Sequence, residues 1–126
     1  MVIVDTSIWI EFFKGNEPYY SQVLGLIQSR VVRTIQPIFG ELYQGALNKK
    51  EKEFIDNFWQ AIFKIEDENL MLNAGIHSYE QKLVTKRIRL IDASIIYTVQ
   101  NNNCTIWTLD KKMLKHLNDN QVFKID

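Results

Sequence analysis

The sequence has little cysteine or proline and no excess of either charge. Among its 126 residues are one cysteine, Cys104, and two prolines. A single cysteine excludes an intrachain disulfide and a multi-cysteine metal cluster, and it fits a reducing compartment. Fifteen acidic residues balance fifteen basic ones, so net charge alone does not make the chain a polyanion binder. Any nucleic-acid site must therefore come from local clusters of basic residues.

Long hydrophobic runs are also missing. No apolar stretch approaches the roughly 18 residues that suggest a membrane-spanning helix. The first apolar run has no basic segment before it and no small-residue cleavage site after it, unlike a secretory signal. We therefore expect a cytoplasmic protein with no membrane partner. Its length, with 46% hydrophobic and 24% charged residues, predicts one globular domain over residues 1–126.

Short β-rich runs alternate with longer helical patterns along the whole chain. Strands are predicted at 2–4, at 31–35, near 63–65, at 104–109 and at 122–125. Helices are predicted over 6–13, around 20–27, from 37 to about 45, around 54–62, around 72–83, after 90 and from 110. This alternation predicts an α/β domain with a mostly parallel central sheet flanked by helices.

Two of the predicted strands run directly into an aspartate. The strand at 2–4 is followed directly by Asp5, and the strand at 104–109 is followed directly by Asp110. Ligands of open α/β sheets bind beyond the carboxyl ends of the strands. If these two strands are neighbours, their acids lie about one strand spacing apart, roughly 5 Å. The pattern predicts that both acids lie at the same edge of the sheet.

Two further acids lie on apolar helix faces. Glu41 shares a helical stripe with Ile38, and Asp92 begins a stripe that continues through Ile95 and Val99. An acidic side chain on the core-facing side of a helix is uncommon unless it is paired or binds a ligand. Both residues are therefore candidates for a functional site.

Helix capping is the simplest alternative for three of these acids. Asp5, Asp92 and Asp110 could each be an ordinary N-cap, because aspartate is among the best capping residues. Capping does not explain Glu41, which lies inside a predicted helix. It also leaves unexplained why two of the caps follow strands and the third joins an apolar face. Taken together, the four acids favour a shared site.

Four carboxylates at one site need a cation. Two carboxylates about 5 Å apart repel by roughly 3 kcal/mol at an effective dielectric near 20, and each raises the pKa of its neighbours. An all-oxygen ligand set selects a hard divalent ion such as Mg²⁺ or Mn²⁺. One such ion, or a pair, can activate water and stabilise a displacement at phosphorus. The acids therefore predict metal-assisted chemistry at a phosphate.

The order and spacing of four short motifs resemble those of the PIN-domain ribonucleases. The motifs are MVIVDTS at the start, Glu41 with Gly45 four residues on, Asp92 before Ala-Ser-Ile-Ile, and TLD at 108–110. More narrowly, the whole chain resembles the VapC toxins of bacterial VapBC toxin–antitoxin pairs. The resemblance implies a Mg²⁺- or Mn²⁺-dependent endoribonuclease, usually a homodimer, that a cognate VapB-like antitoxin silences.

The resemblance also assigns expected roles by matching position. The metal-binding acids are matched by Asp5, Glu41 and Asp92, with Asp110 as a more variable fourth. The polar positions that hydrogen-bond around the site are matched by Thr6, Ser7 and Thr108.

Basic residues adjoin two of these acids. Lys86, Arg87 and Arg89 precede Asp92, and Lys111 and Lys112 follow Asp110. Charge runs are usually solvated faces of a protein, but an acidic site that handles RNA needs cations at its rim to hold phosphates. We expect these five residues to contact the RNA.

Two other functions remain open from the sequence. A phosphoacceptor, receiver-like signalling domain would use Asp5, Asp67, Thr108 and Lys124, which occur in a suggestive order. Thr6 stands where such a site wants a second acid, and two residues after Lys124 leave no room for a closing helix. A non-catalytic RNA-binding protein would keep the fold without cleavage, and the four intact acids argue against it.

Overall fold

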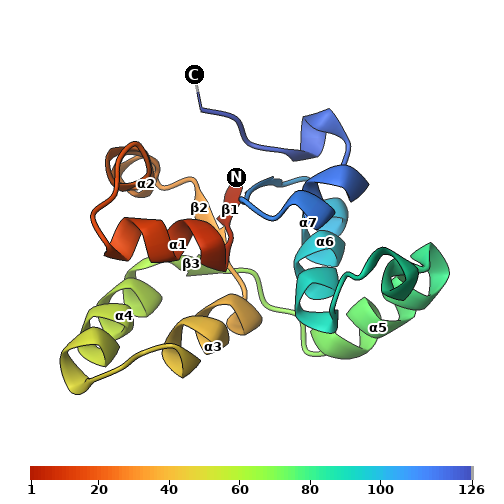
Figure 1. Ribbon diagram of the computed structural model, residues 1–126, viewed down its shortest axis with the longest axis horizontal. Coiled ribbons are helices and arrows are strands. Elements are labelled where there is room, and N and C mark those ends of the chain that lie inside the picture. The colour runs from red at the N-terminus through yellow and green to blue at the C-terminus, as the bar shows by residue number, and fades with distance from the viewer. Residues whose placement is uncertain (126) are drawn as a thin grey trace.

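A four-stranded parallel sheet forms the centre of the computed structural model, which describes residues 1–125 (Figure 1). Its strands are β1 (Val2–Val4), β2 (Val32–Thr34), β3 (Phe63–Lys64) and β4 (Thr105–Trp107). They lie in the order β3-β2-β1-β4, and each neighbouring pair is parallel. The predicted α/β class is confirmed. The strands predicted at 31–35 and 104–109 are shorter at both ends than the patterns indicated.

Helices connect the strands and flank the sheet. In chain order they are α1 (Thr6–Phe13), α2 (Tyr19–Gln28), α3 (Gln36–Gln44), α4 (Lys49–Ala61), α5 (Leu70–Gln81), α6 (Leu90–Asn102) and α7 (Lys111–His116), with short 3-10 helices η1 (Leu83–Lys86) and η2 (Asp119–Gln121). In Figure 1, α1 to α4 gather on one side of the strands and α5 to α7 on the other. Within residues 1–125, no helix is long and apolar enough to cross a membrane.

An aromatic cluster holds the first helix of the domain in place. Trp9 of α1 is fully buried, and its ring centroid lies 5.6 Å from that of Phe12, 5.5 Å from that of Phe39 and 5.8 Å from that of Phe58. Phe39 belongs to α3 and Phe58 to α4, so the cluster joins three helices. Because α1 begins directly after Asp5, this packing also fixes where Asp5 stands.

The strand predicted at 122–125 is wrong. Val122 forms one isolated parallel bridge with Ile106, and the Phe123 N–H donates to the Ile106 carbonyl over 2.8 Å. A longer parallel pairing would need β4 to continue past Trp107 as a partner. β4 ends there, one residue beyond the bridge at Ile106. The pairing therefore stops after one bridge.

Helix α5 packs with a different face from the one that its apolar pattern suggests. The stripe that indicated this helix includes Leu72, Ile76 and Tyr79, which are 65%, 49% and 84% exposed. The face that packs instead carries Leu70 and Ala74, both buried. The helix itself is confirmed, but its most regular apolar stripe is on the surface.

We expect Trp9→Ala to lower the free energy of unfolding by about 3–5 kcal/mol, because it removes a fully buried ring and leaves a cavity. Urea unfolding followed by circular dichroism measures this change. Leu47→Ala is the matched control, since Leu47 is 86% exposed and its loss should cost less than about 0.5 kcal/mol. A loss below about 1 kcal/mol for Trp9→Ala would show that α1 does not depend on this cluster.

Candidate functional site

Asp5 lies at the carboxyl end of β1 and is only 5% exposed. Its backbone N–H donates to the Trp107 carbonyl of β4 over 3.0 Å. Its Oδ2 accepts hydrogen bonds from the hydroxyls of Thr108, at 2.6 Å, and Ser7, at 3.0 Å. Asp5 precedes α1, but its side chain makes no capping hydrogen bond to that helix. Two hydroxyls, rather than a helix terminus, therefore hold this buried carboxylate.

The neighbouring strand brings Asp110 to the same edge of the sheet. Val4 pairs with Trp107 in the parallel register of β1 and β4, so both chains leave the sheet on the same side. The Asp110 N–H then donates to the Thr108 hydroxyl over 3.0 Å. The prediction that Asp5 and Asp110 share one sheet edge is confirmed.

Asp110 is also a true helix cap. Its Oδ1 accepts from the backbone N–H groups of Lys112, at 2.8 Å, and Met113, at 3.3 Å, at the start of α7. The capping interpretation is therefore right for this acid. Because both capping bonds use Oδ1, Oδ2 is the oxygen that Asp110 can offer to a cation.

Glu41 lies inside α3 and is partly buried. Its Oε1 accepts a hydrogen bond from the Thr6 hydroxyl over 2.8 Å. Thr6 is the first residue of α1, directly after Asp5, so this bond ties the glutamate to the end of β1. Helix α3 also packs against both α1 and α6. Glu41 therefore stands between the β1 end and the helix that carries Asp92.

Asp92 lies in the first turn of α6, where Arg89 rather than Asp92 is the N-cap residue. Its pKa is raised to about 6, first by burial and then by the charges of Asp110, Asp5 and Glu41, in that order, against an opposing effect of Arg89. Three acids from three other parts of the chain thus act on this carboxyl group. This electrostatic coupling joins all four predicted acids.

The acids are coupled, but they do not form a closed ligand cage. Within residues 1–125, no group of three or more histidine, cysteine, aspartate or glutamate side chains lies close enough to hold a metal ion as placed. The chemistry of the donors nevertheless fits one, because all four acids supply oxygen, which Mg²⁺ and Mn²⁺ prefer. A divalent cation among them would also offset the repulsion that raises the pKa of Asp92.

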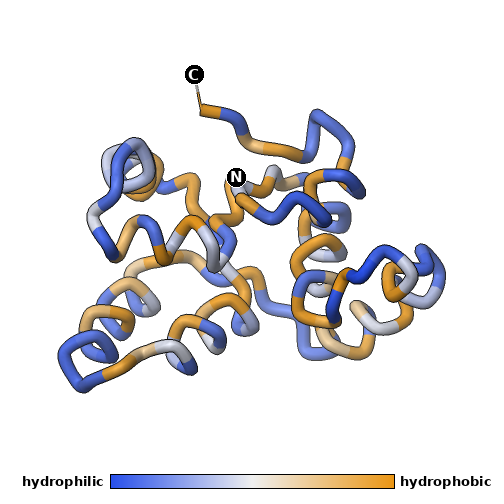
Figure 2. The backbone as a smooth tube through the Cα atoms, in the orientation of Figure 1, coloured by the Kyte–Doolittle hydropathy of each residue, from blue (hydrophilic) through white to orange (hydrophobic). Residues whose placement is uncertain are grey.

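The predicted RNA-contacting residues all lie on the surface, in two groups. In the first group, Lys86 ends η1, and Arg87 and Arg89 follow it before α6. In the second, Lys111 and Lys112 begin α7, and all five side chains are exposed. Figure 2 shows the first group as a hydrophilic segment of the chain.

A contact that the sequence did not reveal lies between these two groups. Lys86 Nζ lies 3.3 Å from Nδ1 of His116 in α7. Burial lowers the pKa of His116, and the charges of Lys86 and His77 lower it further. A helical histidine without a metal-ligand partner gave no sequence signal for this contact. It links the end of η1, which carries Lys86, to α7, which carries the second basic group at its start.

The residues of the receiver-like alternative do not come together. Asp67 follows β3, and β2 separates β3 from β1, at whose end Asp5 lies. Lys124 lies beyond the single bridge at Val122, outside the sheet, and pairs with Asp119 at 3.8 Å. The geometry therefore gives no phosphoacceptor site built on Asp5 and Asp67.

The PIN domain family matches residues 2–119, and the chain belongs to this family. The PIN domain is a nuclease fold. A comparison with curated protein sequences finds no match.

Solved structures with the same fold include PAE2754 from Pyrobaculum aerophilum, at 14% identity and a TM-score of 0.68, over 97% of this chain and 88% of that one. VapBC2 from Rickettsia felis, solved with a DNA fragment from the VapBC2 promoter, matches at 17% identity and a TM-score of 0.67, over 98% of both chains. FitAcB from Neisseria gonorrhoeae matches at 20% identity and a TM-score of 0.62, over 91% of both chains. At these identities the likeness shows the fold.

The raised pKa of Asp92 predicts that the folding stability of the metal-free protein depends on pH. Its folded pKa of about 6 exceeds the unfolded value of roughly 4, so the folded protein binds this proton more tightly. The contribution of Asp92 to stability should therefore fall as pH rises from about 4 to about 6. Asp92→Asn should remove this decline, and it should be at least as stable as wild type at neutral pH.

Urea titrations in EDTA across this pH range measure the difference between wild type and Asp92→Asn. Asp92→Ala, run beside it, should behave in the same way because Asp92 is not the N-cap of α6. Marked destabilisation of both variants at neutral pH would instead mean that Asp92 chiefly stabilises the start of α6 through the helix dipole.

Proposed function

We propose that this chain is a metal-dependent endoribonuclease, the VapC-type toxin of a type II toxin–antitoxin module that acts in the cytoplasm. The observation that carries the proposal is the coupling of Asp92 to Asp110, Asp5 and Glu41 at the carboxyl edge of a PIN-domain sheet. An ordinary surface has no reason to gather four acids with partly buried side chains. A site that holds a cation beside a phosphate does.

The four acids would hold Mg²⁺ or Mn²⁺, with Asp5 and Asp92 binding it directly and Asp110 as a more variable fourth ligand. When bound, such an ion supplies a water of lowered pKa and offsets charge at the scissile phosphate. Glu41 would hold the ion or orient its water from the flank of α3, and the Thr6 hydroxyl fixes Glu41 Oε1. The acids come without a histidine or cysteine nucleophile, so hydrolysis proceeds without a covalent enzyme intermediate.

The hydroxyls around the acids set their positions. Thr108 and Ser7 both donate to Asp5 Oδ2, and the Ser7 hydroxyl also accepts the Leu109 N–H over 3.1 Å. These bonds fix the position of the Asp5 carboxylate at the end of β1. The exposed arginines and lysines on either side would hold the phosphates of the RNA, which the acids by themselves repel.

A homodimer and an antitoxin complete the proposal. The structures of similar fold include VapBC2 from Rickettsia felis, which supports an antitoxin partner here. A groove of about 430 Å³ between α1, α3 and α4 is the surface we expect that partner to use. Its apolar wall includes Ile10, Phe13 and Phe54, and Glu41 also lines it. A segment bound there would thus reach the acids and block the site.

Glu41→Gln keeps the shape of the side chain and removes its charge. We expect it to lower RNA cleavage by orders of magnitude and to weaken Mn²⁺ binding while the fold persists. The assay is cleavage of a mixed RNA pool by antitoxin-free protein with Mg²⁺, Mn²⁺ or EDTA. Glu53→Gln, an exposed glutamate of α4, is the matched control and should cleave like wild type. Full activity in EDTA, or wild-type activity in Glu41→Gln, would contradict the proposal.

The same assay decides the remaining alternative, a non-catalytic RNA-binding protein. That function predicts RNA binding without metal-dependent cleavage, in wild type and Glu41→Gln alike. Metal-dependent cleavage that is lost in Glu41→Gln excludes it.

The arginines should act through the RNA phosphates and not through the metal. In the Glu41→Gln background, which keeps the RNA intact, we expect Arg87→Ala and Arg89→Ala to weaken RNA binding. Each should flatten the slope of log K against log salt by about 0.7 for every phosphate of single-stranded RNA that the variant no longer neutralises. Lys49→Ala, an exposed residue of α4, should leave the slope unchanged. An unchanged slope in both arginine variants would place the RNA elsewhere.

A further inference from the structure

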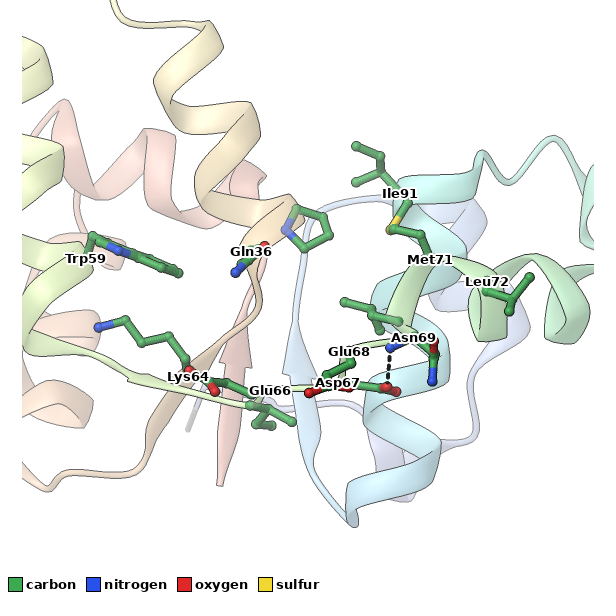
Figure 3. A pocket seen from close by; sticks show the side chains of 13 residues that line it. Gln36, Trp59, Lys64, Glu66, Asp67, Glu68, Asn69, Met71, Leu72 and Ile91 are labelled. Carbon is green, nitrogen blue, oxygen red and sulfur yellow. Dashed lines mark hydrogen bonds between the residues drawn. The ribbon is translucent and has the colours of Figure 1, made fainter.

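A pocket of about 830 Å³ opens at the same edge of the sheet as the four acids (Figure 3). Two of its lining residues come from the carboxyl ends of strands, because Gln36 lies two residues beyond β2 and Ile65 directly follows β3. Both strands run parallel to β1, so these ends lie on the same side of the sheet as Asp5. Ligands of open α/β sheets bind at this edge.

The pocket adjoins the acids through two further lining residues. Pro37 lies four residues before Glu41 in α3, and residues at this spacing are neighbours on one helix face. Ile91 directly precedes Asp92 in α6. One helical turn is about 5.4 Å, which is shorter than a nucleotide. An RNA strand whose scissile phosphate lies at the acids can therefore place a base in the pocket.

One wall of the pocket is aromatic and the other is apolar. Trp59 of α4 packs against Phe39, with ring centroids 5.2 Å apart, and Lys64 Nζ lies 4.6 Å from the centre of the Trp59 ring. Figure 3 shows Trp59 and Lys64 on one side of the pocket and Met71 and Ile91 on the other. An indole held by a neighbouring ring is a platform on which a flat base can stack.

Residues 66–69 join the two walls and carry polar groups (Figure 3). Asp67 Oδ1 accepts the Asn69 N–H over 2.9 Å, so this carboxylate holds the turn before α5. Glu66 and Glu68 are exposed at the pocket. Carboxylates repel phosphate but accept hydrogen bonds from the N–H groups of a base. This part of the pocket therefore suits an uncharged ring with N–H donors.

We propose that this pocket binds a guanine base of the RNA beside the scissile phosphate. Single-stranded RNA is read by stacking its bases on aromatic side chains and by hydrogen bonds along their Watson–Crick edges. Among the four RNA bases, guanine alone has two adjacent N–H donors on that edge, at N1 and N2, and a carboxylate offers two oxygens to accept them. Trp59 provides the stacking face, and Glu66 or Glu68 reads the edge. This inference rests on the proposed function and adds base specificity to it.

Lys64 favours a nucleotide over a basic peptide, which the two glutamates would also attract. Stacking of a base on an aromatic ring is stronger than a cation–π contact at an exposed site. The flexible Lys64 side chain would therefore leave the Trp59 ring to the base, and its ammonium group would pair with a phosphate. The same ammonium group repels the arginine or lysine side chains of a peptide.

Cleavage of a randomised single-stranded RNA pool with Mg²⁺, followed by sequencing of the new ends, measures base preference. Wild type should enrich guanine at one fixed position relative to the cut. The double variant Glu66→Gln/Glu68→Gln keeps both side-chain shapes and removes both carboxylates, so it should lower this preference at least about fivefold. Glu53→Gln/Glu80→Gln removes two exposed carboxylates outside the pocket and should keep the preference.

Binding of uncut RNA tests the pocket without cleavage. In the Glu41→Gln background, we compare oligouridine strands that carry one guanine, one inosine or one 7-deazaguanine. Inosine lacks the N2 amino group and should bind at least about fivefold more weakly than guanine, whereas 7-deazaguanine keeps the Watson–Crick edge and should bind like guanine. The guanine strand should also quench tryptophan fluorescence. Trp59→Phe should lose this quenching, because Trp9 and Trp107 are buried.

The outcomes separate this inference from the proposed function. Metal-dependent cleavage without a guanine preference would overturn the base site and keep the nuclease. A guanine preference that Glu66→Gln/Glu68→Gln retains would overturn the assignment to this pocket. If that variant also loses binding of an oligoarginine peptide, the pocket is a peptide site instead. If wild type cleaves no RNA, the nuclease is overturned, and equal binding of the guanine and inosine strands would overturn the base site as well.

Discussion

One hydroxyl group joins the acids at the ends of two neighbouring strands. Thr108 donates to Asp5 Oδ2 and accepts from the Asp110 N–H, so a single side chain links the carboxylate of one acid to the backbone of the other. It is 6% exposed, and a hydrogen bond to an ionised group is strong in such surroundings. In the parallel register of β1 and β4, Val4 pairs with Trp107, so Thr108 follows as the residue opposite Asp5. The pairing of the two strands therefore places the hydroxyl beside the carboxylate.

The kinds of elements could be predicted because strands and helices differ in hydrophobic period. The prediction failed at 122–125, where an apolar run indicated a strand. A strand needs backbone groups on a neighbouring strand, and β4 ends at Trp107. No local pattern carries that information. The two faces of α5 show a similar limit, since periodicity locates an apolar stripe but does not say whether another element covers it.

The acids could be selected from the sequence because they interrupt apolar patterns. Their local roles could not, because aspartates that follow strands or begin helices look alike. The structure separates them: Asp110 caps α7, Asp5 is held by two hydroxyls, and Asp92 follows the cap residue Arg89. The coupling that raises the pKa of Asp92 depends on residues far apart in the chain, so only the folded arrangement gives it.

The two acids that share Thr108 differ in how freely they could change during evolution. Asparagine, serine and threonine also cap helices, so Asp110 could be replaced by any of them while α7 still begins at Lys111. At Asp5, a side chain that cannot accept hydrogen bonds would leave the Thr108 hydroxyl as an unpaired buried donor. Related chains should therefore drift among capping residues at position 110 and keep a hydrogen-bond acceptor at position 5. The fold lets one member of the site vary without unfolding the helix that follows it.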